Sequence, residues 1–347
     1  MTNTNIADLD DYLDAAGFDE RHKQIAERRA RALQGYFEND YDGQIERLVK
    51  YLRNNVSTAA RGGRMKRRAL FVIGQSGTGK SRAIEWHLSR NKAYQPYVDR
   101  NGRLIRPLIS ITSPSPYSNK EFAREIIREI LGGVALEKKM TETEWFDLLR
   151  RMIREHKVLY LWVDEAQHAR RGVADSEVER LQNMLKRLAQ MEWPLQVIYS
   201  GVEDLSVFLR HKDGQVANRA YVMRLERLTP AKLPVVAKLA KTVIEDFCGL
   251  RAGDNVYSEE TLHRLLRAGD GCLGTMSDIL REACFFAYDR DENSIQISHL
   301  KRTYFDNTGC LRSENMFSSP HYMEMETKYV LSDIPTIVAR KVKGEDS

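Results

Sequence analysis

A glycine-rich turn between an apolar strand and a helix constrains this chain more than any other feature of its sequence. The apolar run 69–73 is too short for a buried helix and leads directly into Gly74-Gln75-Ser76-Gly77-Thr78-Gly79-Lys80-Ser81. This is a complete GxxxxGK[ST] pattern, and a helical pattern over 81–90 follows it. Glycines let backbone N–H groups turn inward around phosphates, and the helix N-terminus adds its positive dipole end. We therefore predict an ATP-binding loop in which Lys80 contacts the β and γ phosphates and Ser81 ligates Mg²⁺.

Two carboxylates follow a second apolar run further along the chain. Residues 158–163 form this run, and Asp164 and Glu165 come directly after it. Open parallel sheets bind their ligands at the carboxyl ends of the strands. The pattern predicts that Asp164 holds the Mg²⁺ shell and that Glu165 orients and deprotonates the water that attacks the γ phosphate.

Two further polar positions extend this pattern. Ser200 ends the strand pattern 195–199, so it is a candidate sensor beside the γ phosphate, although a simple strand-ending turn would also explain it. Arg219 precedes the strand pattern 221–225. In ATPases of this class an arginine at that place points toward a neighbouring subunit's nucleotide and stabilises charge in the transition state. Arg224 is the competing candidate, and a surface arginine without this role is the third possibility.

Strand and helix patterns alternate through the first two thirds of the chain. The strand patterns are 69–73, 108–112, 158–163, 195–200 and 221–225, and the helical patterns between them are 81–90, 119–131, 142–156 and 176–190. The third helix opens with the capping box Thr141-x-x-Glu144. Alternation of this kind predicts an α/β fold in which a parallel sheet has helices on both faces.

The remaining segments divide the chain into four predicted regions. Residues 1–68 form an acidic tail, an amphipathic helix over 45–56 and a basic linker, and residues 69–228 form the sheet core. Helical patterns at 231–248, 258–268, 275–288 and 298–306 predict a small helical lid over 229–310. Residues 311–347 are predicted to be an irregular tail.

Composition narrows the class of protein. The net charge of +5 in 347 residues is mildly basic and permits contact with nucleic acid. The four cysteines show no CxxC pair, so neither a disulfide framework nor a zinc site is indicated. The sequence starts without a basic and apolar leader, and no apolar run approaches the ~20 residues that cross a bilayer. These features predict a cytoplasmic protein.

A hairpin pattern carries most of the predicted DNA contacts. Asn101-Gly102 is a strong two-residue turn signal, and it lies between short stretches able to form strands. The hairpin carries Arg100, Arg103 and Arg106, and Lys120 opens the following helix. These side chains are predicted to meet the DNA backbone. Alternatively the arginines only make the hairpin soluble, and DNA lies at the basic linker 64–68.

Taken together, the motifs at 74–81, 158–167, 197–205 and 218–225 resemble the AAA+ transposition regulators TniB and TnsC. The segment 269–283 resembles the lid helix of that family and, more distantly, of origin-recognition and bacterial secretion ATPases. The resemblance implies an AAA+ fold, ATP and Mg²⁺ as cofactors, and assembly as rings or helical filaments on double-stranded DNA. It also implies a transposase and a target-selecting protein as partners, with the hairpin region facing the DNA channel. Many AAA+ lids carry a sensor arginine near the start of this helix, but Gly274, Thr275 and Met276 stand there in this chain.

The motifs leave three other functions open. A P-loop kinase would need an acceptor pocket and phosphate-clamping lid arginines, and it would have no use for an arginine that acts on another subunit. A scaffold that binds nucleotide without hydrolysis is disfavoured by the intact Lys80, Asp164 and Glu165. A replication-initiator-like or defence-associated AAA+ ATPase is the leading alternative.

Overall fold

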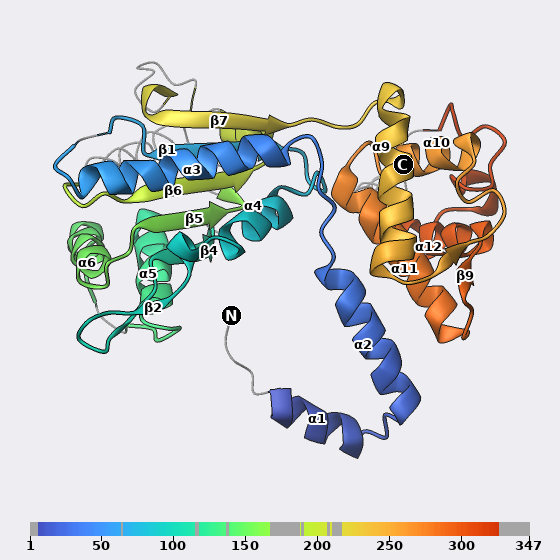
Figure 1. Ribbon diagram of the computed structural model, residues 1–347, viewed down its shortest axis with the longest axis horizontal. Coiled ribbons are helices and arrows are strands. Elements are labelled where there is room, and N and C mark those ends of the chain that lie inside the picture. Colours follow the sequence, from blue (N-terminus) through green and yellow to red (C-terminus); the bar gives the residue numbers. More distant parts are fainter. Residues whose placement is uncertain are drawn as a thin grey trace, which may run out of the picture. The chain divides into compact units, whose positions relative to one another are not determined.

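The computed structural model describes residues 6–63, 65–114, 118–136, 139–166, 188, 191–206, 209 and 217–325. These residues belong to two compact units. The described residues of the first unit lie within Glu38–Glu226, and those of the second lie within Thr4–Phe37 and Arg227–Ser347. Figure 1 shows the elements of each unit.

The first unit is built on a parallel five-stranded sheet. Its strands are β1 (Ala69–Gly74), β4 (Leu108–Thr112), β5 (Tyr160–Asp164), β6 (Gln196–Gly201) and β7 (Ala220–Leu225), in the order β4-β5-β6-β1-β7. Every neighbouring pair is parallel, so all five carboxyl ends lie along one end of the sheet. Strand β1 is buried along its whole length, which requires helices on both faces.

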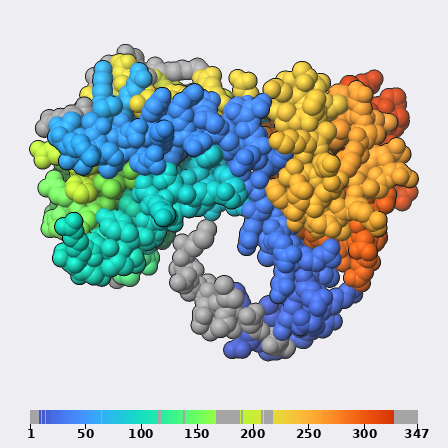
Figure 2. All heavy atoms as spheres, in the orientation of Figure 1, coloured from blue at the N-terminus to red at the C-terminus, as the bar shows by residue number. Residues whose placement is uncertain are grey.

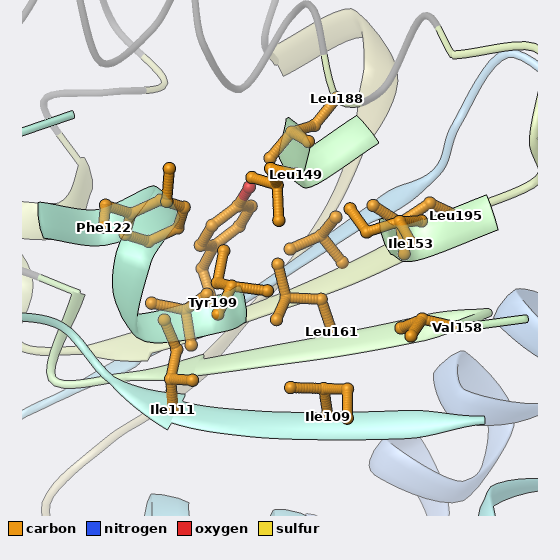
Figure 3. Packing of buried hydrophobic residues seen from close by; sticks show 14 of the residues in the cluster. Ile109, Ile111, Phe122, Leu149, Ile153, Val158, Leu161, Leu188, Leu195 and Tyr199 are labelled. Atoms are coloured by element: carbon orange, nitrogen blue, oxygen red, sulfur yellow. The ribbon is translucent and has the colours of Figure 1, made fainter. Parts of the chain in front are cut away.

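Two pairs of helices cover the two faces of this sheet. Helices α5 (Asn119–Ile130) and α6 (Glu142–Glu155) pack on one face, where Phe122, Leu149 and Ile153 meet Ile109, Leu161 and Tyr199 of the strands (Figure 3). Helices α3 (Asp42–Ala59) and α4 (Lys80–Ser89) cover the other face (Figures 1 and 2). The predicted three-layer α/β core is therefore confirmed.

The local signals in the sequence explain where these helices begin. The side chain of Thr141 accepts the N–H of Glu144, and the Glu144 carboxylate accepts the N–H of Thr141, so the predicted capping box opens α6. Ser118 caps α5 in the same manner by accepting the N–H of Glu121. The predicted helix 176–190 lies outside the described residues except for Leu188.

The hairpin predicted before β4 is present, but its turn is longer than predicted. Strands β2 (Tyr97–Val98) and β3 (Leu104–Ile105) pair antiparallel, and the N–H of Asp99 donates to the Arg103 carbonyl. The loop therefore holds three residues, and the prediction of a two-residue Asn101-Gly102 turn is wrong. The reason is the Asp99 carboxylate, which accepts the N–H groups of Asn101 and Arg103 and so stabilises the wider loop.

The second unit is helical. It contains α1 (Ile6–Ala15), α2 (Glu20–Gln34), α9 (Leu233–Lys241) with a π-helical continuation (Thr242–Phe247), α10 (Glu259–Ala268), α11 (Leu273–Asp289) and α12 (Ile297–Thr308). The helical C-terminal region is thus confirmed. Two short strands, β8 (Arg251–Ala252) and β9 (Ser294–Ile295), form a parallel pair that the sequence analysis did not predict.

Helix α2 packs on the C-terminal helices, although it comes early in the sequence. Ala32 is fully buried in their core, and the Arg29 guanidinium donates to both carboxylate oxygens of Asp289 at 2.7 Å. The Arg281 guanidinium donates to the carbonyls of Ala32 and Gly35. The predicted N-terminal region 1–68 is therefore divided between the two units, since residues 38–68 belong to the sheet unit and α2 belongs to the helical unit.

Two global properties complete the description. None of the helices in the described ranges is long and apolar enough to cross a membrane. The four cysteines are all buried and are not joined in disulfides.

Candidate functional site

The glycine-rich loop joins the carboxyl end of β1 to the N-terminus of α4, as predicted. The Lys80 side chain is 5% exposed, and its Nζ donates to the Gln75 carbonyl at 2.7 Å. The Thr78 hydroxyl donates to the same carbonyl at 2.7 Å. Ser76 is exposed, and Ser81 is half-buried on the first turn of α4. The loop thus brings an ammonium group and two hydroxyl groups, those of Thr78 and Ser81, to one helix end.

Backbone geometry explains why glycines occupy this loop. A Cβ at Gly74 would lie 2.7 Å from the Leu225 carbonyl oxygen, so only glycine fits beside β7. Gly77 and Gly79 have φ of 79° and 89°, a region that residues with side chains rarely adopt. Gly79 is the N-cap of α4 and provides no side-chain cap. A helix N-terminus with no side-chain cap suits an anion, because the positive end of the helix dipole lies there.

Asp164 stands at the carboxyl end of β5, where two hydrogen bonds fix one of its oxygens. The Ser200 hydroxyl donates to Asp164 Oδ1 at 2.6 Å, and the Glu165 N–H donates to the same oxygen at 3.0 Å. Ser200 is fully buried on the adjacent strand β6. The structure therefore brings together Asp164 and Ser200, two residues that were predicted from separate strand patterns.

Glu165 follows Asp164 in an unusual backbone conformation. Its φ is 50°, in the left-handed region, which costs an ordinary L-residue roughly 1–2 kcal/mol. Glu165 is only half-buried. Strain of this kind in a non-glycine residue is concentrated at functional sites, where it fixes the direction of a side chain.

This donor set fits ATP with Mg²⁺. An uncapped helix N-terminus, inward-turned glycines and a buried ammonium group suit a chain of phosphates. Mg²⁺ prefers oxygen ligands such as the Ser81 hydroxyl and the Asp164 carboxylate. The carboxylate of Glu165, directly after Asp164, adds a group able to take a proton.

Arg219 lies at the opposite end of the sheet. It ends a short 3-10 turn (Ala217–Arg219) immediately before β7, and its carbonyl accepts the N–H of Arg68. The six residues of β7 separate it from the glycine-rich loop by roughly 20 Å along the strand. Arg219 therefore does not reach the loop of its own subunit. Arg224 is exposed and pairs in register with Ile73, much closer to that loop.

Two of the four predicted DNA-contacting side chains are exposed on the hairpin, one in its loop and one directly after the loop. They are Arg100 and Arg103, and the Arg103 guanidinium lies 3.3 Å from His156 Nδ1. Burial, and then the positive charge of Arg103, lower the pKa of His156 below its usual value. The hairpin is also held by Asp99, whose pKa is lowered chiefly by its hydrogen bond to Lys157.

The other two side chains lie elsewhere. The Arg106 guanidinium donates to the carbonyls of Glu129 and Ile130, so it caps the C-terminal end of α5. Lys120 is half-buried on the first turn of α5. Because an α-helix rises about 1.5 Å per residue, Lys120 and Glu129 are roughly 14 Å apart along the axis. The structure does not bring Lys120 together with the hairpin arginines.

Two residues at this end of the sheet were missed by the sequence analysis. The indole Nε1–H of Trp162 donates to the Ser200 hydroxyl oxygen at 2.8 Å. The Ser113 N–H donates to the Asp164 carbonyl, while its own hydroxyl is buried without a partner among the described residues. A polar residue directly after the strand pattern 108–112 was a readable signal for Ser113. No local signal marked Trp162, because tryptophan is ordinary in a buried strand.

Solved structures with a similar fold support the architecture. Cdc6p from Pyrobaculum aerophilum matches with a TM-score of 0.55 and 15% identity, covering 78% of this chain and 67% of its own. ORC1 from Aeropyrum pernix, solved in complex with DNA, gives 0.55 and 14%, covering 80% and 69%. ORC2 from the same organism, solved in ADPNP-ADP complexes, gives 0.54 and 16%, covering 79% and 70%. At these identities the likeness shows the fold alone, and that fold is AAA+, as predicted.

Sequence comparison identifies the family. No curated protein matches the chain. The family model described as "Bacterial TniB protein" matches residues 40–230, which is more than half of the 347 residues. This span contains the glycine-rich loop, Asp164, Ser200 and Arg219. The resemblance found in the sequence motifs is confirmed, and the chain belongs to the bacterial TniB protein family.

Proposed function

We propose that this protein is an ATP-hydrolysing AAA+ protein that assembles on double-stranded DNA and regulates transposition. One observation carries the enzymatic part of this proposal. Lys80 and Ser81 begin α4 at the carboxyl end of the sheet, where Asp164 and Glu165 also end their strand. Phosphate-binding, metal-binding and proton-accepting groups thus converge at one end of the sheet.

Each of these side chains has a distinct role in the proposal. The N–H groups of α4 and the Lys80 ammonium hold the phosphates of ATP, and the loop glycines leave room for that approach. Ser81 and Asp164 hold Mg²⁺, which would neutralise negative charge on the phosphate oxygens. The Glu165 carboxylate orients a water molecule and takes its proton. The strained φ of Glu165 supports this role, because it fixes the direction of the side chain.

The position of Arg219 supports assembly into an oligomer. An arginine roughly 20 Å along the strand from its own glycine-rich loop does not reach that subunit's nucleotide, so its proposed target is the nucleotide of another subunit. In related NTPases an arginine supplied in this way raises the turnover rate by ~10³ to 10⁵. We propose that Arg219 has this role, in a ring or a helical filament.

DNA is the proposed partner of the assembled protein. Arg100 and Arg103 are exposed on a protruding hairpin, and exposed arginines bind phosphates independently of sequence. Lys120 can offer a second phosphate contact at the N-terminus of α5. Arg106 is the weakest candidate, because its guanidinium already caps α5. ORC1 from Aeropyrum pernix, which has a similar fold, was solved in complex with DNA, and this supports the proposal.

Membership of the TniB family supports the biological part of the proposal. We propose that the assembly links target selection to recruitment of the transposase, and that the protein works in the cytoplasm. ATP binding is proposed to favour assembly, and hydrolysis to end it.

A direct experiment tests the proposal. We would measure phosphate release from ATP, and we would image the protein by negative-stain microscopy with an ATP analogue, with and without duplex DNA. We expect Mg²⁺-dependent turnover, and rings or filaments on DNA only when the analogue is present. A protein that binds no nucleotide, or that stays monomeric on DNA with the analogue, would refute the proposal.

A second candidate function is suggested by the fold likeness to Cdc6 and ORC proteins. A replication-initiator-like or defence-associated ATPase could use the same site and the same DNA contacts. A transposition assay in cells that carry the cognate element separates the candidates. The transposition proposal requires that insertion frequency fall when the Lys80→Ala variant replaces the wild type.

A further inference from the structure

Three side chains at the carboxyl end of the sheet form a chain of hydrogen bonds. The Trp162 Nε1–H donates to the Ser200 hydroxyl oxygen at 2.8 Å, and that hydroxyl donates to Asp164 Oδ1 at 2.6 Å. Trp162 and Asp164 are two residues apart on β5, so their side chains leave the same face of the strand. Ser200 approaches both from the neighbouring strand β6.

The chemistry of the three groups fixes the direction of this chain. An indole N–H can only donate, and an ionised carboxylate can only accept. A serine hydroxyl has a single proton, and here the Trp162 N–H occupies one of its acceptor positions. The 2.6 Å separation is typical of an O–H group that donates to a charged oxygen. Because Ser200 is fully buried, its proton points at Asp164.

This direction changes the role expected for Ser200. A sensor of the γ phosphate would have to donate its hydroxyl proton to the nucleotide, but the Ser200 hydroxyl already donates to Asp164 Oδ1. Oδ1 of Asp164 accepts from both Ser200 and the Glu165 N–H, whereas Oδ2 takes part in none of the hydrogen bonds that the described residues make. Two donors on one oxygen hold the carboxylate in a single orientation and leave the other oxygen for a ligand.

We infer that Trp162 is a positioning residue for the metal site. Its indole N–H donates to the Ser200 hydroxyl oxygen, so the Ser200 hydroxyl in turn donates to Asp164 and orients the carboxylate that holds Mg²⁺. Ser200 then acts through Asp164 rather than by direct contact with the γ phosphate. This inference rests on the proposed function, because it assigns Mg²⁺ to Asp164. Groups that orient a metal ligand in this way typically contribute 10–100-fold in metal affinity or activity.

The Trp162→Phe variant tests the inference because it keeps an aromatic ring and removes the N–H donor together with the five-membered ring that carries it. We would measure binding of a fluorescent ATP analogue with and without Mg²⁺, and the Mg²⁺ concentration that gives half-maximal turnover. We expect binding without Mg²⁺ to stay within about twofold of wild type. The enhancement by Mg²⁺ should fall, and the half-saturating Mg²⁺ concentration should rise, each by about tenfold.

Trp193→Phe is the matched control. Its indole Nε1–H donates to the Val158 carbonyl at 2.5 Å, before β5 begins and far from Asp164. This variant also loses one indole hydrogen bond, but its Mg²⁺ dependence should match that of wild type. Equal shifts in Trp162→Phe and Trp193→Phe would overturn the inference, because they would indicate a general loss of packing.

A double-mutant cycle completes the test. Ser200→Ala should weaken the Mg²⁺ effect by itself, and Trp162→Phe should add nothing in that background, because the hydroxyl it directs is absent. If thermal unfolding shows that Trp162→Phe is not folded, then Ser200→Ala decides, and an unchanged Mg²⁺ effect overturns the inference. A wild type that binds no nucleotide refutes the proposed function and the inference together. A normal wild type with an unchanged Trp162→Phe variant overturns the inference alone.

Discussion

The carboxyl and amino ends of the parallel sheet hold their functional side chains in different ways. At the carboxyl end, Lys80 and Ser200 are buried, and each makes a hydrogen bond shorter than 2.8 Å. At the amino end, Arg219 is half-buried before β7, and the hairpin before β4, at the other edge of the sheet, exposes Arg100 and Arg103. The side chains at the carboxyl end are therefore held in place by hydrogen bonds within the protein, whereas the amino end exposes positive charge to solvent.

Under the proposed function, this difference assigns ATP chemistry to one end of the sheet and contact with partners to the other. Chemistry on ATP needs groups fixed in direction, because misplaced groups lose most of their effect. Contact with a neighbouring subunit or with DNA needs exposed charge, and partners complete such a site. We therefore expect substitutions at the carboxyl end to act within one subunit, and substitutions at the amino end to act through partners.

The largest expected effect separates the two ends by complementation. Arg219→Ala should lower turnover by ~10³ because the transition-state charge on a neighbour is no longer stabilised. Lys80→Ala should lose nucleotide binding itself. Mixing the two variants should restore part of the activity, since an intact ATP site then meets an intact arginine.

The control for that experiment is Arg224→Ala, at the exposed carboxyl half of β7. We expect it to turn over ATP within a few fold of wild type. Mixtures that co-assemble without any recovery would remove Arg219 from the interface.

The second-largest expected effect is a loss of ATP turnover caused by a substitution at the carboxyl end of the sheet. Glu165→Gln should keep ATP binding and lower turnover by at least ~10², because the amide cannot take a proton from water. Phosphate release and analogue binding measure the two properties separately. Glu203→Gln, which changes an exposed acid just after β6, is the matched control and should behave as wild type. Turnover by Glu165→Gln within a few fold of wild type would contradict the assignment.

A smaller effect is expected at the hairpin. Replacing both Arg100 and Arg103 by Ala should weaken DNA binding in the presence of ATP and leave ATP binding intact. Each lost phosphate contact reduces the slope of log affinity against log salt by about 0.9, so the slope should fall by about 2 per subunit. Lys120→Ala, roughly 14 Å from Arg106's contact on α5, tests whether the helix N-terminus contributes separately. An unchanged slope in the double variant would move the DNA to the basic linker at 64–68.

The smallest effect is a pH dependence of hairpin packing. The pKa of His156 is lowered by burial first and by Arg103 second, so the unfolded chain binds a proton at higher pH than the folded protein does. The contribution of neutral His156 to the free energy of unfolding is therefore fully present above pH ~6.5. It is lost as the pH falls through the lowered pKa of the folded protein. Arg103→Ala should raise the pKa of His156 in an NMR titration, whereas Arg100→Ala should leave it unchanged. A pKa that does not move in Arg103→Ala would exclude the electrostatic contribution.

The core of the fold could be read from the sequence because its signals are local. Short apolar runs marked all five strands, and the Thr141–Glu144 capping box marked the start of α6. The place of α2 could not be read, because its contacts with Asp289 and Arg281 join residues far apart in the chain. The hairpin turn was misjudged for a related reason, since the Asp99 carboxylate overrides the preference of Asn-Gly for a two-residue loop.

The candidate site could likewise be predicted where its signals are local, and not where it depends on contacts between strands. Lys80 ends the glycine-rich motif that follows one strand, and Asp164 ends another strand, so the motif and the strand order were enough to predict them. The partnership of Ser200 with Trp162 depends on the register between β5 and β6, which no local pattern contains. The separation of Lys120 from the hairpin likewise follows from the length and direction of α5.

The packing of α2 on the C-terminal helices has a consequence for synthesis of the chain. Asp289 follows its partner Arg29 by 260 residues. At about 5–20 residues per second, α2 leaves the ribosome on the order of 10 to 50 s before that partner exists. In this interval the sheet unit can complete its core, while the apolar face of α2 around Ala32 stays uncovered. A nascent chain of this protein thus carries an exposed early helix for most of its synthesis, and a chaperone that binds short apolar segments would find it there.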